Sequence, residues 1–194
     1  EGLQQNNVSI AFIDGGNAEL VSSSGFSISF IRIFHTIYTR GVRSSCASDE
    51  FYVLCSARNI DGKLAYQANM YRSKGKHLDD SFFRDILVFD PFDKELREGM
   101  SRMNISRLPS LVRRLAEIRS AKALAQKIGE GNVVLLDGNL ESKFLLESEA
   151  LVSLHDAAKQ GGVSVCALSK TCDLLSGSGS SAIVMLNKAA PANS

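Results

Sequence analysis

The stretch AFIDGGNAEL, residues 11–20, decides the first element of the fold. Residues 10–13 are an apolar run with the composition of a buried strand, and this run stops at Asp14, which two glycines follow. Asp-Gly is a common turn sequence, because Asp accepts backbone N–H bonds and Gly adopts positive φ angles. The stretch VVLLDGNLES, residues 133–142, repeats the arrangement and ends its apolar run at Asp137. We therefore predict two strands that each end in Asp-Gly.

The two aspartates predict a metal site if their strands are parallel neighbours. The carboxyl ends of parallel strands lie at one edge of an open α/β sheet, where ligands bind. Two close carboxylates repel each other unless a proton or a cation lies between them. Hard cations such as Mg²⁺ and Mn²⁺ prefer such oxygen ligands. The alternative is that Asp14 and Asp137 are only the polar ends of strands.

The first third of the chain predicts an antiparallel meander. Residues 26–39 are rich in Ile and Phe, with stretches of alternation that favour a strand. Residues 50–57 and 63–71 have the same character, and they flank Asp61-Gly62, which is a hairpin-turn signal.

From residue 78 onward the pattern changes to helices that alternate with short strands. Apolar residues at helical spacing predict helices at residues 78–89, 106–127 and 143–160. Two short apolar runs, 132–137 and 163–168, suit strands that are buried on both faces of a parallel sheet. The whole order predicts a single α/β domain over residues 1–194. Its mixed sheet would begin as an antiparallel meander, continue with parallel strands, and be flanked by helices.

The helix predicted at residues 106–127 carries a third candidate acid. Ser106 is the expected N-cap, and a proline follows in the first turn. At about 100° per residue, Glu117 lies about 180° from Leu108 and faces away from the apolar stripe. Glu117 is therefore either a metal ligand or a solvated side chain that pairs with Arg113 or Arg114.

Basic residues surround Glu117 in the sequence. Residues 97–127 hold eight basic and two acidic residues. The candidate DNA contacts are Arg107, Arg113, Arg114, Arg119 and Lys122. A basic helix beside a carboxylate metal site suits phosphodiester cleavage, because cations hold the phosphates while metal ions activate water. A solvated helix face is the alternative. Lys170, after the strand predicted at 163–168, either holds a phosphate or the attacking water, or is a surface residue.

Composition limits the other possibilities. With 194 residues, of which 44% are hydrophobic, the chain can bury one substantial core. The four cysteines form no C-x-x-C pair and the three histidines are far apart, which disfavours a zinc site and suits reduced thiols in the cytoplasm. No apolar run is long enough to predict a membrane span, and the net charge of +1 neither requires nor excludes a polyanionic partner.

Segments that span nearly the whole chain resemble, in order, the motifs of a known family. They are SIAFIDGGNAEL, FSISFIRIFHTIYTR, RRLAEIRSAKAL, NVVLLDGNLES and GVSVCALSKTCDLL. The family is the NurA domain of archaeal DNA double-strand-break repair nucleases. The resemblance implies an RNase H-like core in which Asp14, Glu117 and Asp137 bind the metal ions. Lys170 matches the lysine that follows the fifth strand of the family.

The resemblance also implies an activity and partners. It implies a deoxyribonuclease dependent on Mn²⁺, or on Mg²⁺, that degrades single-stranded DNA from the five-prime end and nicks it internally during end resection. The implied mechanism is in-line attack of a metal-bound water, with two ions about 3.5–4 Å apart. The implied assembly is a homodimer on a HerA-type hexameric ATPase. Because family members continue with a late catalytic His or Asp, we expect this chain to be a fragment.

Two other functions stay open at this stage. The first is a non-catalytic DNA-binding or adaptor domain for a translocating ATPase, in which the carboxylates are structural. The second is an actin-like phosphotransferase, which shares the strand that ends in Asp-Gly-Gly but requires a second half-domain.

Overall fold

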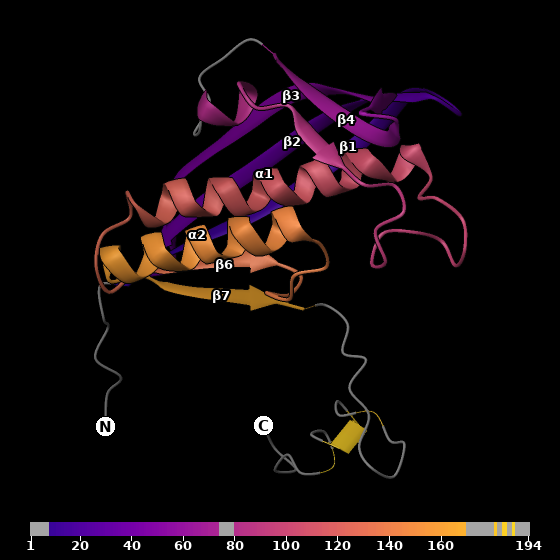
Figure 1. The fold of residues 1–194 in the computed structure, drawn as a ribbon. Coiled ribbons are helices and arrows are strands. Elements are labelled where there is room, and N and C mark those ends of the chain that lie inside the picture. The colour runs from indigo at the N-terminus through magenta and orange to yellow at the C-terminus, as the bar shows by residue number, and fades with distance from the viewer. Residues whose placement is uncertain (1–7, 74–79, 170–180, 182–183, 186–187, 189–194) are drawn as a thin grey trace.

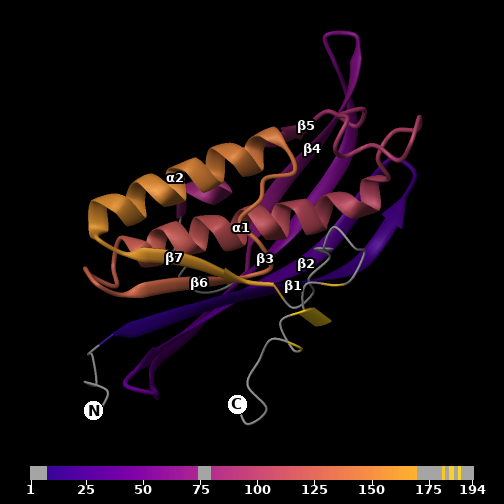
Figure 2. The ribbon, with the colours of Figure 1, turned by 90° about the horizontal axis from the view of Figure 1, so that it is seen from below.

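Seven strands form one mixed sheet, and two helices cover one of its faces (Figures 1 and 2). The computed structural model describes residues 8–73, 80–169, 181, 184, 185 and 188. The strands are β1 (Ser9–Ser23), β2 (Phe26–Thr39), β3 (Val42–Ile60), β4 (Lys63–Arg72), β5 (Leu87–Phe89), β6 (Val133–Asp137) and β7 (Ser164–Leu168). The helices are α1 (Leu108–Ala125) and α2 (Leu145–Gly161), with short 3₁₀ helices η1 (Asp80–Phe83) and η2 (Ile105–Arg107).

The sheet joins an antiparallel half to a parallel half at β1. Its strand order is β5-β4-β3-β2-β1-β6-β7. Strands β1 to β5 pair antiparallel with one another, whereas β6 is parallel to both β1 and β7. The hairpin predicted at Asp61-Gly62 is confirmed, since both residues have positive φ between β3 and β4. The predicted α/β class, with a meander followed by parallel strands, is also confirmed.

Burial alternates along the central strands and shows which face the helices cover. Ala11 and Ile13 of β1 are buried, while Phe12 between them is exposed. The same alternation buries Ile31 of β2 and Phe51 of β3. Strand side chains alternate between the two faces of a sheet, so one face forms the core under α1 and α2. We call the opposite face the open face. Neither α1 nor α2 is long and apolar enough to cross a membrane.

Strand β1 does not end at Asp14, and the predicted turn there is wrong. Asp14, Gly15 and Gly16 pair with residues of β2, and the strand continues to Ser23. The long strand β2 supplies backbone partners over this whole length, so the glycines stay extended instead of turning. Neither Gly15 nor Gly16 has a positive φ.

Several predicted helix boundaries and burial patterns are wrong. Within residues 80–89, the predicted helix is replaced by η1 and by β5, because the Leu87–Phe89 segment alternates buried and exposed side chains and pairs with β4. The helix predicted at residues 106–127 spans Leu108–Ala125, and its N-cap is Arg107, without a side-chain capping bond, rather than Ser106; Asn104 caps the preceding η2. Strand β7, at the edge of the sheet, is not buried on both faces as predicted: its residues alternate between exposed and half-buried.

Adding a methyl group at Gly15 should destabilise the fold. A Cβ there would lie 2.7 Å from Glu117 Oε1 and 2.8 Å from Ile33 Cδ1. Overpacking of this kind typically costs about 1–3 kcal/mol. We expect Gly15→Ala to lower the free energy of unfolding by that amount in urea denaturation.

Gly16→Ala is the matched control for this prediction. Gly16 is the next residue of the same strand, and a Cβ there would meet nothing within 4 Å. We expect this variant to leave the free energy of unfolding unchanged or to raise it by up to about 1 kcal/mol, because Ala reduces the conformational entropy of the unfolded chain. Equal midpoints for the two variants would show that the space beside Gly15 is not restrictive.

Candidate functional site

Asp14 and Asp137 lie side by side on neighbouring parallel strands. In the pairing of β1 with β6, Ile13 is opposite Leu136, and each aspartate is the next residue of its strand. Ile13 and Leu136 are buried under α1, so alternation places both aspartates on the open face. Adjacent strands are about 4.8 Å apart. The strands that carry the two aspartates are therefore parallel neighbours, which is the condition on which the predicted metal site depends.

Glu117 approaches the same part of β1 from the helix-covered face. Its carboxylate packs against Gly15, where only a glycine leaves the necessary space. Glu117 is 3% exposed, so the prediction of a solvated side chain is wrong. Helix α1 contacts β1, β2 and β6 of the sheet and also packs against α2, so most of its surface is enclosed (Figure 2).

Two arginines of α1 hold the Glu117 carboxylate. Arg113 pairs with Oε1 through Nη1, which also donates to the carbonyl oxygen of Gly15 at 2.8 Å. The Nη1 of Arg114 lies 3.6 Å from Oε2. The predicted pairing of Glu117 with Arg113 and Arg114 is confirmed. These contacts fasten α1 to the backbone of β1 directly beside Asp14.

Arg114 extends this network to β6 and α2. Its Nε donates to Glu147 Oε1 at 3.0 Å, and its Nη1 donates to the carbonyl oxygen of Asp137 at 3.2 Å. Its Nη2 donates to the carbonyl oxygen of Asn139. Glu147 is 3% exposed and also accepts from the backbone N–H of Lys143 at 2.9 Å. One guanidinium therefore positions the end of β6, the loop after it and the start of α2.

The remaining predicted DNA contacts lie elsewhere along α1 and at its N-terminal end. Arg107 pairs with Glu98 at 3.2 Å, and Arg119 pairs with Asp85 at 3.1 Å. Lys122 lines a cavity of about 340 Å³ between α1 and α2. The acidic partners of these arginines come from outside the basic segment or from its margin, so the helix is less free to bind phosphates than its composition indicates.

The environment of Glu117 changes its protonation. Burial raises the pKa of Glu117 to about 7, and the negative charge of Asp14 acts in the same direction. Arg113 and Arg114 lower this pKa but do not outweigh burial. Glu117 therefore exchanges a proton near neutral pH, within the electrostatic range of Asp14.

The donor set at this edge fits a hard cation only in part. Asp14 is exposed and Asp137 half-buried, and together they offer carboxylate oxygens of the kind that Mg²⁺ and Mn²⁺ bind. Within the described residues, no group of three or more His, Cys, Asp or Glu side chains is arranged to hold a metal ion. Glu117 is engaged by its arginines, and Lys170 lies outside the described residues.

Two features of the site were missed from the sequence. Glu147 stands in the first turn of α2, where an acidic residue is usually solvated, so nothing marked it as buried. Phe34 of β2 lies opposite Asp14. It is at one of the exposed positions of the alternating segment 26–39. The alternation of that segment could have indicated an aromatic side chain beside Asp14.

Comparisons with protein-family models, with curated proteins and with solved structures find no match to this chain. The function is therefore argued from the arrangement of its own residues.

The raised pKa of Glu117 predicts a pH-dependent stability. Between its ordinary value of 4.5 and about 7, the folded state retains a proton that the unfolded chain releases. The folded state is then favoured at the acidic end, and this contribution is lost as the pH rises through 7. We expect the free energy of unfolding to fall by up to roughly 3 kcal/mol across this window.

The variant Glu117→Gln isolates this effect, because it keeps the shape of the side chain and removes its titration. Urea denaturation at several pH values should show a smaller slope between pH 4.5 and 7 for this variant than for the unmodified protein. Glu149→Gln, an exposed position on α2, should retain the original slope. Identical slopes for all three proteins would contradict the prediction.

Proposed function

We propose that this chain is a NurA-type, metal-dependent DNA nuclease with an RNase H-like core. The observation that carries the proposal is that Asp14 and Asp137 each follow the last pair, Ile13 and Leu136, of the parallel strands β1 and β6. The substrate would be single-stranded DNA, cut from its five-prime end and internally, in the resection of broken ends. The likeness of sequence motifs supports the same activity.

The strand order supports an RNase H-like core. Three antiparallel strands, β3-β2-β1, continue into the parallel strands β6 and β7, with α1 and α2 as the connections. In that arrangement β6 is the fourth core strand and ends in Asp137, while β4 and β5 extend the sheet at its far edge. Glu117 on α1 is then the helical glutamate of the fold.

Each acidic residue has a separate role in the proposed reaction. Asp14 and Asp137 would hold Mn²⁺ or Mg²⁺, which supplies an activated water and neutralises charge at the phosphate. A cation between the two carboxylates would neutralise their like charges, which favours its binding. Glu117 holds a proton near neutral pH, and Arg113 and Arg114 orient it beside β1. The predicted homodimer and the HerA-type ATPase partner rest on the motif resemblance alone, and the cytoplasmic location rests on the cysteine pattern.

One observation favours the alternative of a non-catalytic DNA-binding or adaptor domain. The carboxylate of Glu117 is already paired with two arginines, as it would be in a purely structural network. In that case the acidic residues stabilise the packing of α1, and no hydrolysis occurs. The two functions differ in whether metal binding leads to cleavage.

Titration of Mn²⁺ into the unmodified chain and into Asp137→Ala tests the proposal. Calorimetry should show Mn²⁺ binding that is more than about 10-fold weaker in the variant. Even the replacement of a residue that only orients a metal ligand typically weakens metal binding by about 10- to 100-fold. Degradation of single-stranded DNA with Mn²⁺ should be lost in parallel. Asp156→Ala, an exposed aspartate of α2, is the control and should change neither readout.

The outcomes separate the two functions. Binding and cleavage that disappear together in Asp137→Ala support the nuclease. Metal binding without cleavage in the unmodified chain supports the adaptor instead. If the unmodified chain does not bind Mn²⁺, the metal site is refuted, and Asp14 and Asp137 are adjacent for structural reasons only.

A further inference from the structure

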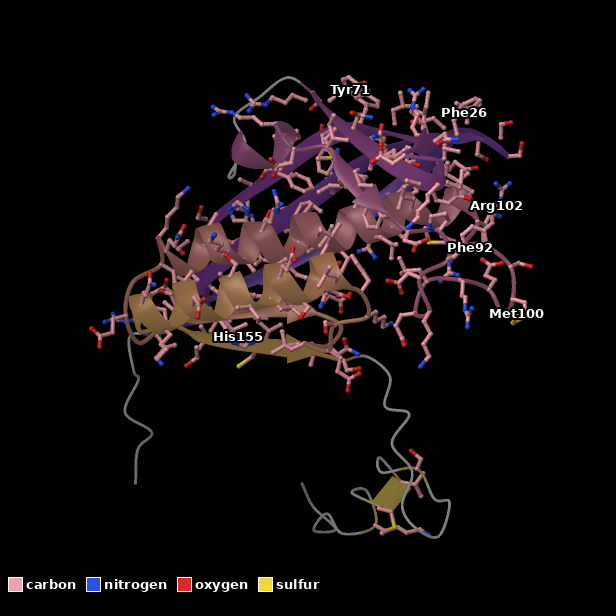
Figure 3. All side chains as sticks on the ribbon, in the orientation of Figure 1. Phe26, Tyr71, Phe92, Met100, Arg102 and His155 are labelled. Carbon is pink, nitrogen blue, oxygen red and sulfur yellow. The ribbon has the colours of Figure 1, made fainter. Side chains whose placement is uncertain are left out.

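Aromatic side chains are concentrated on the open face of the sheet. Phe34 is 41% exposed on β2 and lies opposite Asp14. Phe30 is four residues before Phe34 on β2 and so lies on the same face of the sheet. It packs edge-to-face on Tyr52 of β3 with a centroid distance of 5.4 Å. Tyr52 is opposite Tyr71 of β4, which Figure 3 shows at the sheet side of the molecule, away from α2. Exposed rings therefore continue across three strands from the neighbourhood of Asp14.

A hollow of about 530 Å³ lies in this face beside Asp14. Its walls include Asp14, Gly16 and Ala18 of β1 and Phe30, Arg32 and Phe34 of β2. The hollow exists because Gly16 is opposite Arg32 and Ala18 is opposite Phe30, so small residues face large ones. Its volume falls in the range of about 300–1,000 Å³ that is usual for small-ligand sites.

Arg32 gives the hollow a cationic side. Its Nε and Nη2 contact Glu50 Oε1 at 2.7 and 2.6 Å, and its side chain is still 59% exposed. A guanidinium has five N–H donors, so this pair does not exhaust its capacity. The hollow thus offers aromatic rings, a cation that can approach a phosphate, and the carboxylate of Asp14 at one end.

We propose that this hollow binds an unpaired nucleobase of a single DNA strand, which stacks on Phe34 while the adjoining phosphate contacts Arg32. This inference rests on the proposed nuclease function and assigns residues that select the form of its substrate. Stacking on aromatic side chains accepts any base, because every base has a π-face. In a duplex these faces are covered by neighbouring base pairs, so only an unpaired strand can use Phe34.

The position of the hollow favours a DNA strand over a protein partner. A flat protein interface across this face would remove the Arg32–Glu50 pair from water, which carries a desolvation penalty. A nucleotide can leave that pair partly solvated. Phe34 and Asp14 are cross-strand neighbours, so a base held on Phe34 brings its backbone next to the proposed metal ligands.

The test measures strand binding without cleavage. Fluorescence anisotropy would follow a labelled oligothymidylate of about 15 nucleotides in the presence of EDTA, with the full chain. We expect Phe34→Ala to weaken binding roughly 5- to 100-fold. Phe34→Tyr, which keeps the aromatic ring, should restore most of the affinity. Phe92→Ala, an exposed ring between β5 and η2 (Figure 3), should bind like the unmodified chain.

Two further probes identify what Phe34 recognises. An abasic strand of the same length should bind the unmodified chain more weakly than oligothymidylate, and it should be insensitive to Phe34→Ala. A duplex should likewise be insensitive to this substitution. Binding of oligothymidylate that stays within about twofold in Phe34→Ala, or an abasic strand that binds equally well, would overturn the stacking site.

The remaining outcomes separate this inference from the nuclease proposal. If the unmodified chain does not cleave DNA but Phe34→Ala weakens strand binding, the nuclease is refuted and the base-binding site remains. If the unmodified chain cleaves DNA and Phe34→Ala leaves strand binding unchanged, the base-binding site is refuted and the nuclease remains. Sedimentation of both proteins completes the test. If Phe34→Ala dissociates a dimer and leaves strand binding unchanged, the hollow belongs to an interface with a second copy, and the stacking site is refuted.

Discussion

The contact between the Glu117 carboxylate and Gly15 is the constraint on which the rest of this structure depends. It joins α1 to β1, the strand that belongs to both the antiparallel and the parallel halves of the sheet. A buried carboxylate is costly, and Arg113 and Arg114 offset part of that cost by supplying charge and hydrogen bonds. The same arginines bind backbone carbonyl groups at Gly15 and Asp137, so the network that stabilises the helix also sets the positions of the two strand segments that carry the aspartates.

This arrangement has opposite consequences for the two faces of the sheet. On the covered face, the Glu117 and Glu147 carboxylates are buried and paired with arginines, and Glu147 comes from an element that is distant in sequence from its partner Arg114. On the open face, the aspartates share their surroundings with exposed aromatic rings. A cation attracted by Asp14 and Asp137 would therefore lie at the surface, where a strand of DNA has direct access, and the ion pairs beneath would keep the backbone in place.

The parts of the structure that were predictable from sequence depend on local patterns. Alternation in residues 26–39 and the Asp61-Gly62 turn predicted the meander, and the short apolar runs at residues 132–137 and 163–168 predicted the parallel strands. Local patterns failed where a distant element decides the outcome. Leu87–Phe89 is a strand because β4 offers it an edge, and β1 passes through Asp14 because β2 continues opposite it. Glu117 is buried because its side chain lies against Gly15 of β1, and a helical wheel of α1 alone does not show which element the helix will contact.

The unequal lengths of β1 and β6 have a consequence for hydrogen exchange. Strand β6 accompanies β1 only from Ile10 to Ile13, whereas β2 accompanies it to the end of the strand. In the first segment both edges of β1 lie beside another strand. In the second, successive amides alternate between those directed at β2 and those directed away from it. Deuterium uptake along β1 should therefore be uniformly slow before Asp14 and alternate between slow and fast after it. The residue proposed to bind the metal then also marks a boundary in the protection of backbone amides.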